Sequence, residues 1–505
     1  MTSQTQAPDL VLDEAPPAAD GAPPRRSERA GAIVYGAIWV STLVVAGIIL
    51  WGDLERATVG VLVLVLMLQL LAVNVPIGLA MVMASVVGFY ALGGTRVVVS
   101  SLTSQPFDAV ASWSLSVVPL FIFLGMVIWR GGLADSAYEA TRQWFGKVPG
   151  GLAVASNLAG AGLSAGTGST IGTAYALGRM ALPQMFRAGY DVRLATGVIA
   201  MAGTLGQIIP PSILLVVYAG IAETPVGPQL LAGIVPGLLL ALAYALLVVV
   251  RATLKPGLAP RPDLSDVTWG SRLRSLGMLV PLGAVVFVVI GGMYFGFFTA
   301  TESAAFGVVA ALVVSWKPWS RKRLKPREMG ALVKTAATES SLSVGGIVFM
   351  IIGAVALTRV LAMSGVTRQL TDVLIDLNLS RVWFLILLIA FYMLLGTFIE
   401  PLPMMLLTVP ILHAPLESMG VDMVWFGVFI VILAEMGIVT PPVGILANVV
   451  HRIAQRPEVN QGREVKAADV FKGVLPFLVV VCLVLVALIL EPAIVTWLPG
   501  SASTR

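Results

Sequence analysis

The chain is poor in charged residues, histidine and cysteine. Charged side chains make up 12% of its 505 residues, against about 25% in a typical soluble protein. The mean hydropathy is +0.92 and 57% of the residues are hydrophobic. These values exclude an ordinary soluble domain and predict a polytopic helical protein of the lipid bilayer. The net charge of +5 does not indicate nucleic-acid binding, because the basic residues are sorted by membrane side.

The scarcity of reactive side chains excludes several kinds of site. A single cysteine, Cys482, supports neither a disulfide framework nor a thiolate metal site. The two histidines, His413 and His451, are too far apart in sequence to suggest a metal cluster. The motifs of zinc proteases, serine hydrolases and nucleotide-binding loops are missing from the sequence. We therefore expect no enzyme, no catalytic residues and no organic cofactor.

Long apolar segments dominate the rest of the chain and predict an all-α fold of about eleven spans and two re-entrant hairpins. Residues 1–30, rich in proline, alanine and acidic residues, predict a disordered tail. Residues 31–56 hold an extra N-terminal span. A polar linker at 251–274 divides the remainder into two halves, residues 57–250 and 275–497.

Each half contains an apolar segment that a proline pair interrupts. Pro210–Pro211 lies within 194–221 and Pro441–Pro442 lies within 421–450, an offset of 231 residues. Proline removes a backbone donor and crowds the preceding helical turn. Freed carbonyls cannot face lipid, so each break must be buried in protein or line a wet cavity. Paired helix breaks in two halves point to the binding site of a transporter.

A candidate hairpin precedes each broken helix. The first, 149–182, carries a run of small and hydroxyl residues at Ser164–Gly172, and the second, 382–412, turns at Gly396–Pro401. The same offset carries Gly206 onto Gly437, so hairpins and breaks keep one register in both halves.

Lysine and arginine placement predicts the orientation. With the amino terminus in the cytoplasm, all but six of the 32 Lys and Arg fall on the cytoplasmic side. The first hairpin then enters from the cytoplasm and the second from outside, which makes the halves an inverted repeat, as in several secondary-transporter families.

The broken helices expose carbonyl groups that suit a cation and N–H groups that suit a carboxylate. We expect sodium ligands at both hairpin–break pairs: Thr167, Ser169, Thr170, Gly203, Gly206, Gly396, Thr397, Gly437, Thr440 and Gly444. We expect substrate contacts from Ser164, Thr204, Gln207, Pro210, Pro211, Ser212, Glu400, Pro441, Pro442 and Asn448. Glu435 is either a buried structural partner or part of the site. The alternative is that the Gly/Ser/Thr runs only pack helices closely.

Five motifs carry a resemblance to a known family. They are Thr167–Thr170 with Gly178, Gly189–Asp191, Gly203–Ile213, Thr301–Ala304 and Gly437–Gly444. From about Ala57 onward the chain resembles the large (DctM-like) permease subunit of tripartite ATP-independent periplasmic (TRAP) transporters. Thr167 and Thr170 stand where the family often has serine, which keeps the hydroxyl. The extra span at Gly31–Trp51 has no counterpart in the usual large subunit.

The resemblance implies sodium-coupled uptake of an organic acid, usually a carboxylate, across the bacterial inner membrane. It also implies an elevator motion and two protein partners, a small (DctQ-like) membrane subunit and a periplasmic (DctP-like) substrate-binding protein. Two alternatives stay open at this point: a stand-alone sodium/carboxylate symporter of the same repeat plan, and a membrane scaffold that transports nothing.

Overall fold

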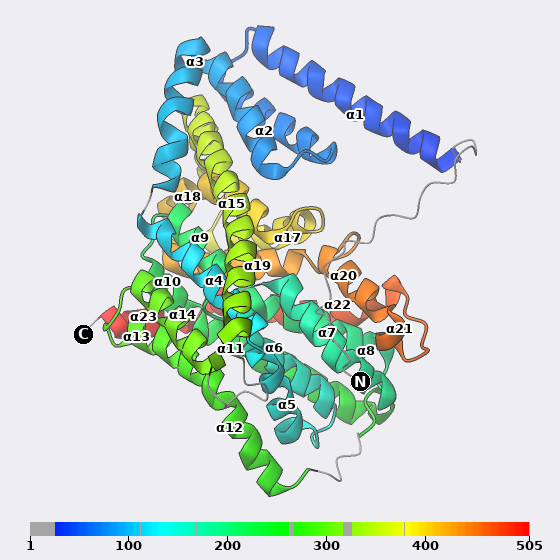
Figure 1. The fold of residues 1–505 in the computed structure, drawn as a ribbon. Coiled ribbons are helices and arrows are strands. Elements are labelled where there is room, and N and C mark those ends of the chain that lie inside the picture. The colour runs from blue at the N-terminus through cyan, green and yellow to red at the C-terminus, as the bar shows by residue number, and fades with distance from the viewer. Residues whose placement is uncertain are drawn as a thin grey trace.

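The computed structural model describes residues 26–111, 113–167, 169–261, 267–316, 326–377 and 379–503. Every regular element in these ranges is helical, which confirms the expected all-α class (Figure 1). Residues 1–25 of the expected tail lie outside the described ranges.

The first half begins with α1, which lies at the edge of the molecule against α2 (Figure 1). A hydrogen bond from the Tyr35 hydroxyl to the carbonyl of Val73, 2.9 Å, fastens α1 beside the end of α2. The elements up to the first hairpin are α1 (Arg26–Trp51), α2 (Arg56–Ala72), α3 (Ile77–Val110), η1 (Trp113–Ser116), α4 (Val117–Arg130) and α5 (Leu133–Phe145).

The first hairpin and the first broken helix follow directly. The elements are α6 (Gly151–Thr167), α7 (Thr170–Arg187), α8 (Val192–Thr204), η2 (Leu205–Gln207), α9 (Ile213–Ile221), α10 (Val226–Ala232), α11 (Ile234–Leu254) and η3 (Pro256–Leu258). Here α6 and α7 form the hairpin, and α8 and α9 are the two parts of the broken helix.

The second half repeats this order. Its elements are α12 (Trp269–Val286), the π-helical turn η4 (Phe287–Gly291), α13 (Gly292–Tyr294), α14 (Ala300–Trp316), α15 (Pro326–Ser364), α16 (Val366–Asp376), α17 (Arg381–Gly396), α18 (Pro401–Ser418), α19 (Met423–Gly437), α20 (Ile445–Ala454), α21 (Pro457–Asn460), α22 (Ala467–Leu490) and α23 (Ala493–Ser503). The second hairpin is α17 with α18, and the second broken helix is α19 with α20.

The two halves keep the 231-residue register down to single positions. The offset carries both ends of α7 onto both ends of α18 and the start of α8 onto the start of α19. Gly189 and Gly420 both adopt positive φ, of 84° and 66°, just before these starts. Asp191 and Asp422 then cap α8 and α19 with side-chain oxygens that accept backbone N–H groups. The turn between hairpin and broken helix is therefore built the same way twice.

The sequence predicts polar loops at 94–108 and 364–381 and an interfacial stretch followed by a separate span between 327 and 363, but the structure has helices in all three segments. The polar segment after Gly94 belongs to α3, which only kinks at Gly93–Gly94, where φ of Gly94 is 66°. The interfacial stretch and the span expected between residues 327 and 363 form the single helix α15, of 39 residues. The polar loop expected before Arg381 contains α16. Polarity misled the prediction, because a helix at a membrane surface is polar on one face without being a loop.

Among the described residues, five helical segments are long and apolar enough to cross a membrane: Ile77–Val110, Val226–Leu254, Trp269–Tyr294, Arg327–Ser364 and Ala467–Leu490. Shorter apolar helices include both arms of the second break, Met423–Gly437 and Ile445–Ala454. A helix of 10 to 15 residues is too short for a bilayer core of about 30 Å. The total of eleven spans and two hairpins stays a prediction.

Glycines let helices of the two halves approach closely. Along α3 and α15, a Cβ on Gly353 would lie 2.8 Å from the carbonyl oxygen of Gly78. Where α8 meets α22, a Cβ on Gly473 would lie 2.0 Å from the carbonyl oxygen of Arg193. An ion pair between Arg193 and Asp469, 3.2 Å, closes the same contact. The halves therefore interlock instead of lying side by side.

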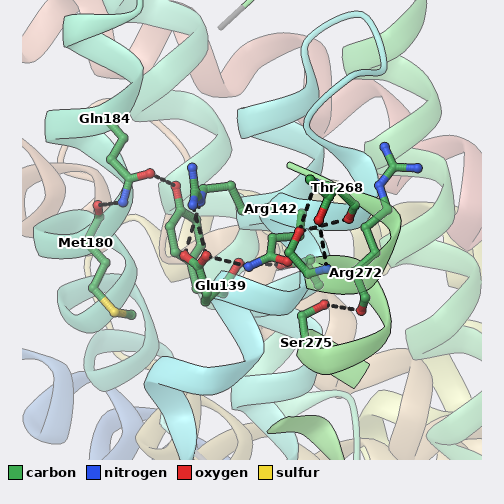
Figure 2. Close-up of polar contacts among 11 residues, drawn as sticks. Glu139, Arg142, Met180, Gln184, Thr268, Arg272 and Ser275 are labelled. Carbon is green, nitrogen blue, oxygen red and sulfur yellow. Dashed lines mark hydrogen bonds and ion pairs between the residues drawn. The ribbon is translucent and has the colours of Figure 1, made fainter. Parts of the chain in front are cut away.

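The amphipathic helix α5 connects the first hairpin to the second half (Figure 2). The Tyr138 hydroxyl donates to the side-chain oxygen of Gln184 in α7, 3.3 Å away. At the other end of α5, the Trp144 indole N–H donates to the carbonyl of Arg272 in α12, 3.2 Å away. Since α5 touches both neighbours through directional bonds, it fixes the outer end of the hairpin relative to α12.

The repeated caps give a test of the register. Asp422→Ala removes the oxygen that accepts the Trp425 N–H at 2.8 Å, and we expect it to lower the free energy of unfolding by about 0.5–2 kcal/mol. Asp422→Ser restores an acceptor at the same position and should recover most of that loss. Unfolding midpoints of the purified protein in detergent measure both, and equal midpoints for Asp422→Ala and the unchanged protein would contradict the capping role.

Candidate functional site

The tip of the first hairpin is the turn between α6 and α7. Ser169 is the N-cap of α7, and its hydroxyl oxygen accepts the Gly172 N–H at 3.2 Å. Thr170 begins the helix and is buried. The side chains of Ser164 and Thr167, both predicted site residues in α6, lie outside the described residues. The described part of the tip thus offers the carbonyls and hydroxyls of Ser169 and Thr170.

Side chains close the first break where the prolines remove backbone donors. The Pro210–Pro211 peptide bond is cis, and α9 starts only at Ile213. The Ser212 hydroxyl accepts the Leu215 N–H at 3.2 Å and donates to the carbonyl of Gln207. These bonds satisfy backbone groups that a continuous helix would have paired. The polar atoms of Ser212 therefore support the unwound backbone.

The first tip and the first break lie against each other. A Cβ on Gly206 would meet the carbonyl oxygen of Ser169 at 3.2 Å, and one on Gly203 would meet the carbonyl oxygen of Thr170 at 3.0 Å. The Thr204 hydroxyl donates to the carbonyl of Met201 at 2.7 Å, within its own helical segment. The structure thus brings together the predicted ligands Ser169, Thr170, Gly203 and Gly206.

The backbone groups at the second break are hydrogen-bonded in a different way. The Leu446 N–H donates across it to the carbonyl of Ile438 at 3.1 Å. Gly444 has φ of 49° at the start of α20, where a Cβ would also meet the Phe471 ring at 2.5 Å. The Thr440 hydroxyl donates to the carbonyl of Met436, and the Asn448 side-chain amide donates to the carbonyl of Val443 at 2.5 Å. Asn448 therefore supports the loop in the present arrangement.

The second tip contacts the second break through two glycines. A Cβ on Gly396 would lie 2.5 Å from the Cα of Gly437, so the two backbones touch. Thr397 follows directly, and its buried hydroxyl donates to the carbonyl of Leu394 at 2.9 Å. Thr397 and Thr440 thus have their hydroxyl hydrogens engaged within their own segments.

The two breaks differ in exposure. Pro210, Pro211 and Ser212 are buried, whereas Pro442 is exposed and Pro441 is partly exposed. Glu400, at the N-cap of α18, is exposed as well. The first break is therefore covered by protein, and the second is exposed at Pro442, although Thr397 and Thr440 beside it are buried.

The two acids singled out in the sequence occupy different environments. Glu400 is exposed beside the second tip. Glu435 is 1% exposed, and its carboxylate accepts a hydrogen bond from the Thr170 hydroxyl of the first tip. The sequence left the role of Glu435 open. The contact joins positions 265 residues apart, and no local pattern in the sequence indicates it.

Both pairs present carbonyl and hydroxyl oxygens, which are the ligands an alkali cation takes. They lie beside glycines at which an added Cβ would clash with neighbouring atoms, and unwound backbone of this kind binds sodium in repeat-built transporters. The described residues contain no group of three or more His, Cys, Asp or Glu that could hold a metal ion. When bound, sodium would supply a positive charge between tip and break. Ser169, Thr170, Gly203 and Gly206 would hold it at the first pair, and Gly396, Thr397, Gly437 and Thr440 at the second.

Two hairpins that face two broken helices in matching positions define a class of repeat-built membrane transport proteins. The family model of the tripartite ATP-independent periplasmic transporter, DctM component, matches residues 64–494. The chain belongs to this family.

Similar proteins agree with this assignment. The C4-dicarboxylate TRAP transporter large permease protein DctM of Pseudomonas aeruginosa is 30% identical over 404 residues, 80% of this chain and 90% of that protein. The ectoine/5-hydroxyectoine large permease UehC of Ruegeria pomeroyi is 28% identical over 87% of this chain and 98% of that protein. The sialic acid large permease SiaM of Vibrio cholerae is 27% identical, covering 86% and 96%. The chain is accordingly an integral membrane transport protein and not an enzyme.

Solved structures share the fold at low sequence identity. The Alcanivorax borkumensis YdaH transporter aligns with a TM-score of 0.57 and 14% identity, covering 81% of this chain and 95% of that one. Neisseria gonorrhoeae MtrF aligns with a TM-score of 0.51 and 12% identity, covering 88% and 96%. At such identity the likeness concerns the fold alone.

The glycine contact at the second pair can be tested directly. A Cβ at Gly437 would lie 2.7 Å from the Cα of Gly396 and 2.9 Å from the carbonyl oxygen of Tyr392. Because both neighbours are backbone atoms, Gly437→Ala must push the hairpin away, and we expect a loss of about 1–3 kcal/mol in unfolding free energy.

Gly345→Ala is the matched control, since Gly345 is a helical glycine with open space around its Cβ position. We expect its unfolding midpoint to equal or exceed that of the unchanged protein. If Gly437→Ala behaves like Gly345→Ala, the second tip and break do not pack as described.

Proposed function

We propose that the chain is the large membrane subunit of a sodium-coupled uptake system for an organic acid, most simply a carboxylate. It works in the bacterial inner membrane with its amino terminus in the cytoplasm. The observation that carries the proposal is the twin arrangement of hairpin tip and helix break, in one register and in contact at each pair.

The helix ends explain how one site serves a cation and an anion. The carbonyl ends of α8 and α19 carry partial negative charge, and the N–H ends of α9 and α20 carry partial positive charge. Sodium placed at the carbonyl ends lowers the cost of bringing a carboxylate next to the N–H ends. The two ligands therefore stabilise each other, which is what coupling requires.

The relatives support an acidic substrate. Their names give C4-dicarboxylate, sialic acid, ectoine and isethionate as cargo, all of which carry an acid group. We infer that the exposed second pair, with Glu400 and Pro442 at its rim, is where substrate approaches. Movement of the hairpins and broken helices as one body, an elevator motion, would carry it across.

The family also supports two partners. A tripartite system pairs the large subunit with a small membrane subunit and a periplasmic binding protein, and the binding protein delivers the substrate. The competing reading is a stand-alone symporter of the same plan. Reconstitution of the chain alone and of the three components together in proteoliposomes separates them. Uptake by the chain alone would support the symporter, and uptake only with all components supports the tripartite system.

Loss of hydroxyl ligands should weaken sodium binding. In the reconstituted system, Thr440→Ala and Ser169→Ala should each raise the sodium concentration for half-maximal uptake about tenfold, which corresponds to roughly 1.4 kcal/mol. Thr440→Ser and Ser169→Thr keep the oxygen and should stay close to the unchanged protein. Sodium dependence that is the same in both alanine variants would rule out these assignments.

A further inference from the structure

Glu435 is a buried acid that is not among the residues forming the tip–break contacts described above. It lies in α19, two residues before the glycine that contacts the second tip, and 1% of it is exposed. In the described part of the chain, it takes part in no ion pair with lysine, arginine or histidine. A buried carboxylate is costly unless something compensates its charge. Its retention therefore points to a compensating positive charge that is not a protein side chain, either a bound cation or a proton on the carboxyl group itself.

The carboxylate is directed at the first pair, although it belongs to the second half. The Thr170 hydroxyl oxygen lies 2.9 Å from one carboxylate oxygen of Glu435 and 2.8 Å from the other. The carbonyl of the same Thr170 faces Gly203, and the carbonyl of Ser169 faces Gly206. Only one hydroxyl group separates the negative charge from the oxygens expected to bind sodium.

The hydrogen bond determines what Thr170 can bind. Because the carboxylate accepts the hydroxyl hydrogen, the lone pairs of the Thr170 oxygen are free for a cation. Thr204, Thr397 and Thr440 are oriented in a similar way, but their acceptors are neutral carbonyls. Thr170 has an ionisable acceptor, which adds charge as well as orientation. Outer groups that orient a ligand and raise its basicity commonly tune ion affinity.

The second pair lacks the same device. The 231-residue offset places Thr204 opposite Glu435 and Pro401 opposite Thr170. Neither replacement can supply the carboxylate–hydroxyl contact. The two pairs are therefore alike in backbone and unlike in charge.

We propose that Glu435 is a positioning residue of the first sodium site: it orients the Thr170 hydroxyl and supplies the negative charge that a bound sodium ion balances. The proposal rests on the sodium coupling proposed above. It makes sodium affinity at the first site depend on a residue of the second half, so that α19 and the first hairpin are held together most strongly when the ion is present.

The test measures sodium binding without transport. The full chain is purified in detergent, and its unfolding temperature is recorded against sodium chloride concentration, with choline chloride keeping the ionic strength constant. A ligand that binds the folded state raises this temperature with a concentration dependence set by its affinity. Glu435→Gln, which keeps the shape and an acceptor but loses the charge, should raise the half-effective sodium concentration at least tenfold.

Companion variants separate positioning from a structural role. Thr170→Val should raise the half-effective sodium concentration as Glu435→Gln does. The double variant should raise it no further than either single variant, because both substitutions disrupt the same contact. Thr170→Ser keeps the donor and should retain the original sodium response. Glu491→Gln, an exposed acid after α22, is the control and should also retain it.

Each outcome decides something. If the unchanged protein shows no sodium-dependent stabilisation, the proposed sodium coupling fails, and the role of Glu435 fails with it. If it does respond, and Glu435→Gln and Thr170→Val lower the unfolding temperature without shifting the sodium dependence, the coupling stands and Glu435 is only structural. Should Glu435→Gln not fold, Thr170→Val against Thr170→Ser decides the same question.

Discussion

The need to satisfy every backbone polar group in a medium without water governs this molecule. A proline pair inside an apolar helix frees backbone carbonyls to which lipid cannot donate a hydrogen bond. At the first break the Ser212 hydroxyl hydrogen-bonds to backbone groups, and at the second the Leu446 N–H donates to the carbonyl of Ile438. Each break packs against a hairpin tip at glycines that allow backbone to touch backbone. Under the function proposed above, carbonyls beside the two breaks bind an ion, which would make the defect the functional feature.

The same constraint explains what could be predicted from the sequence. Proline pairs, hydroxyl runs and glycines are local signals, so the breaks, the hairpins and the 231-residue register were all accessible. The contacts of Gly206 with the first tip and Gly437 with the second followed from that register. In the structure each hairpin tip contacts the helix break of its own half. Ion and substrate binding at these contacts are proposals.

Other features depend on tertiary contacts and were not accessible. The contact between Glu435 and Thr170 joins the two halves, and only the fold determines that α19 reaches the first hairpin. The helical character of residues 95–110 and of α16 was missed because hydropathy measures polarity, not backbone conformation. The difference in exposure between Pro211 and Pro442 also depends on which helices cover each break, and the two prolines look alike in sequence.

The continuous helix α15 has a mechanical consequence. Its 39 residues make a rod of about 58 Å at 1.5 Å per residue, whereas the matching residues of the first half, 95–133, are divided among the end of α3, η1, α4 and the start of α5. A long helix resists bending, so the second half has one stiff helix where the first half has several shorter helical pieces. Gly365, with φ of 79°, lies directly after α15, where the chain turns into α16. Two halves with the same order of helices therefore differ in how far they bend when the same force acts on them.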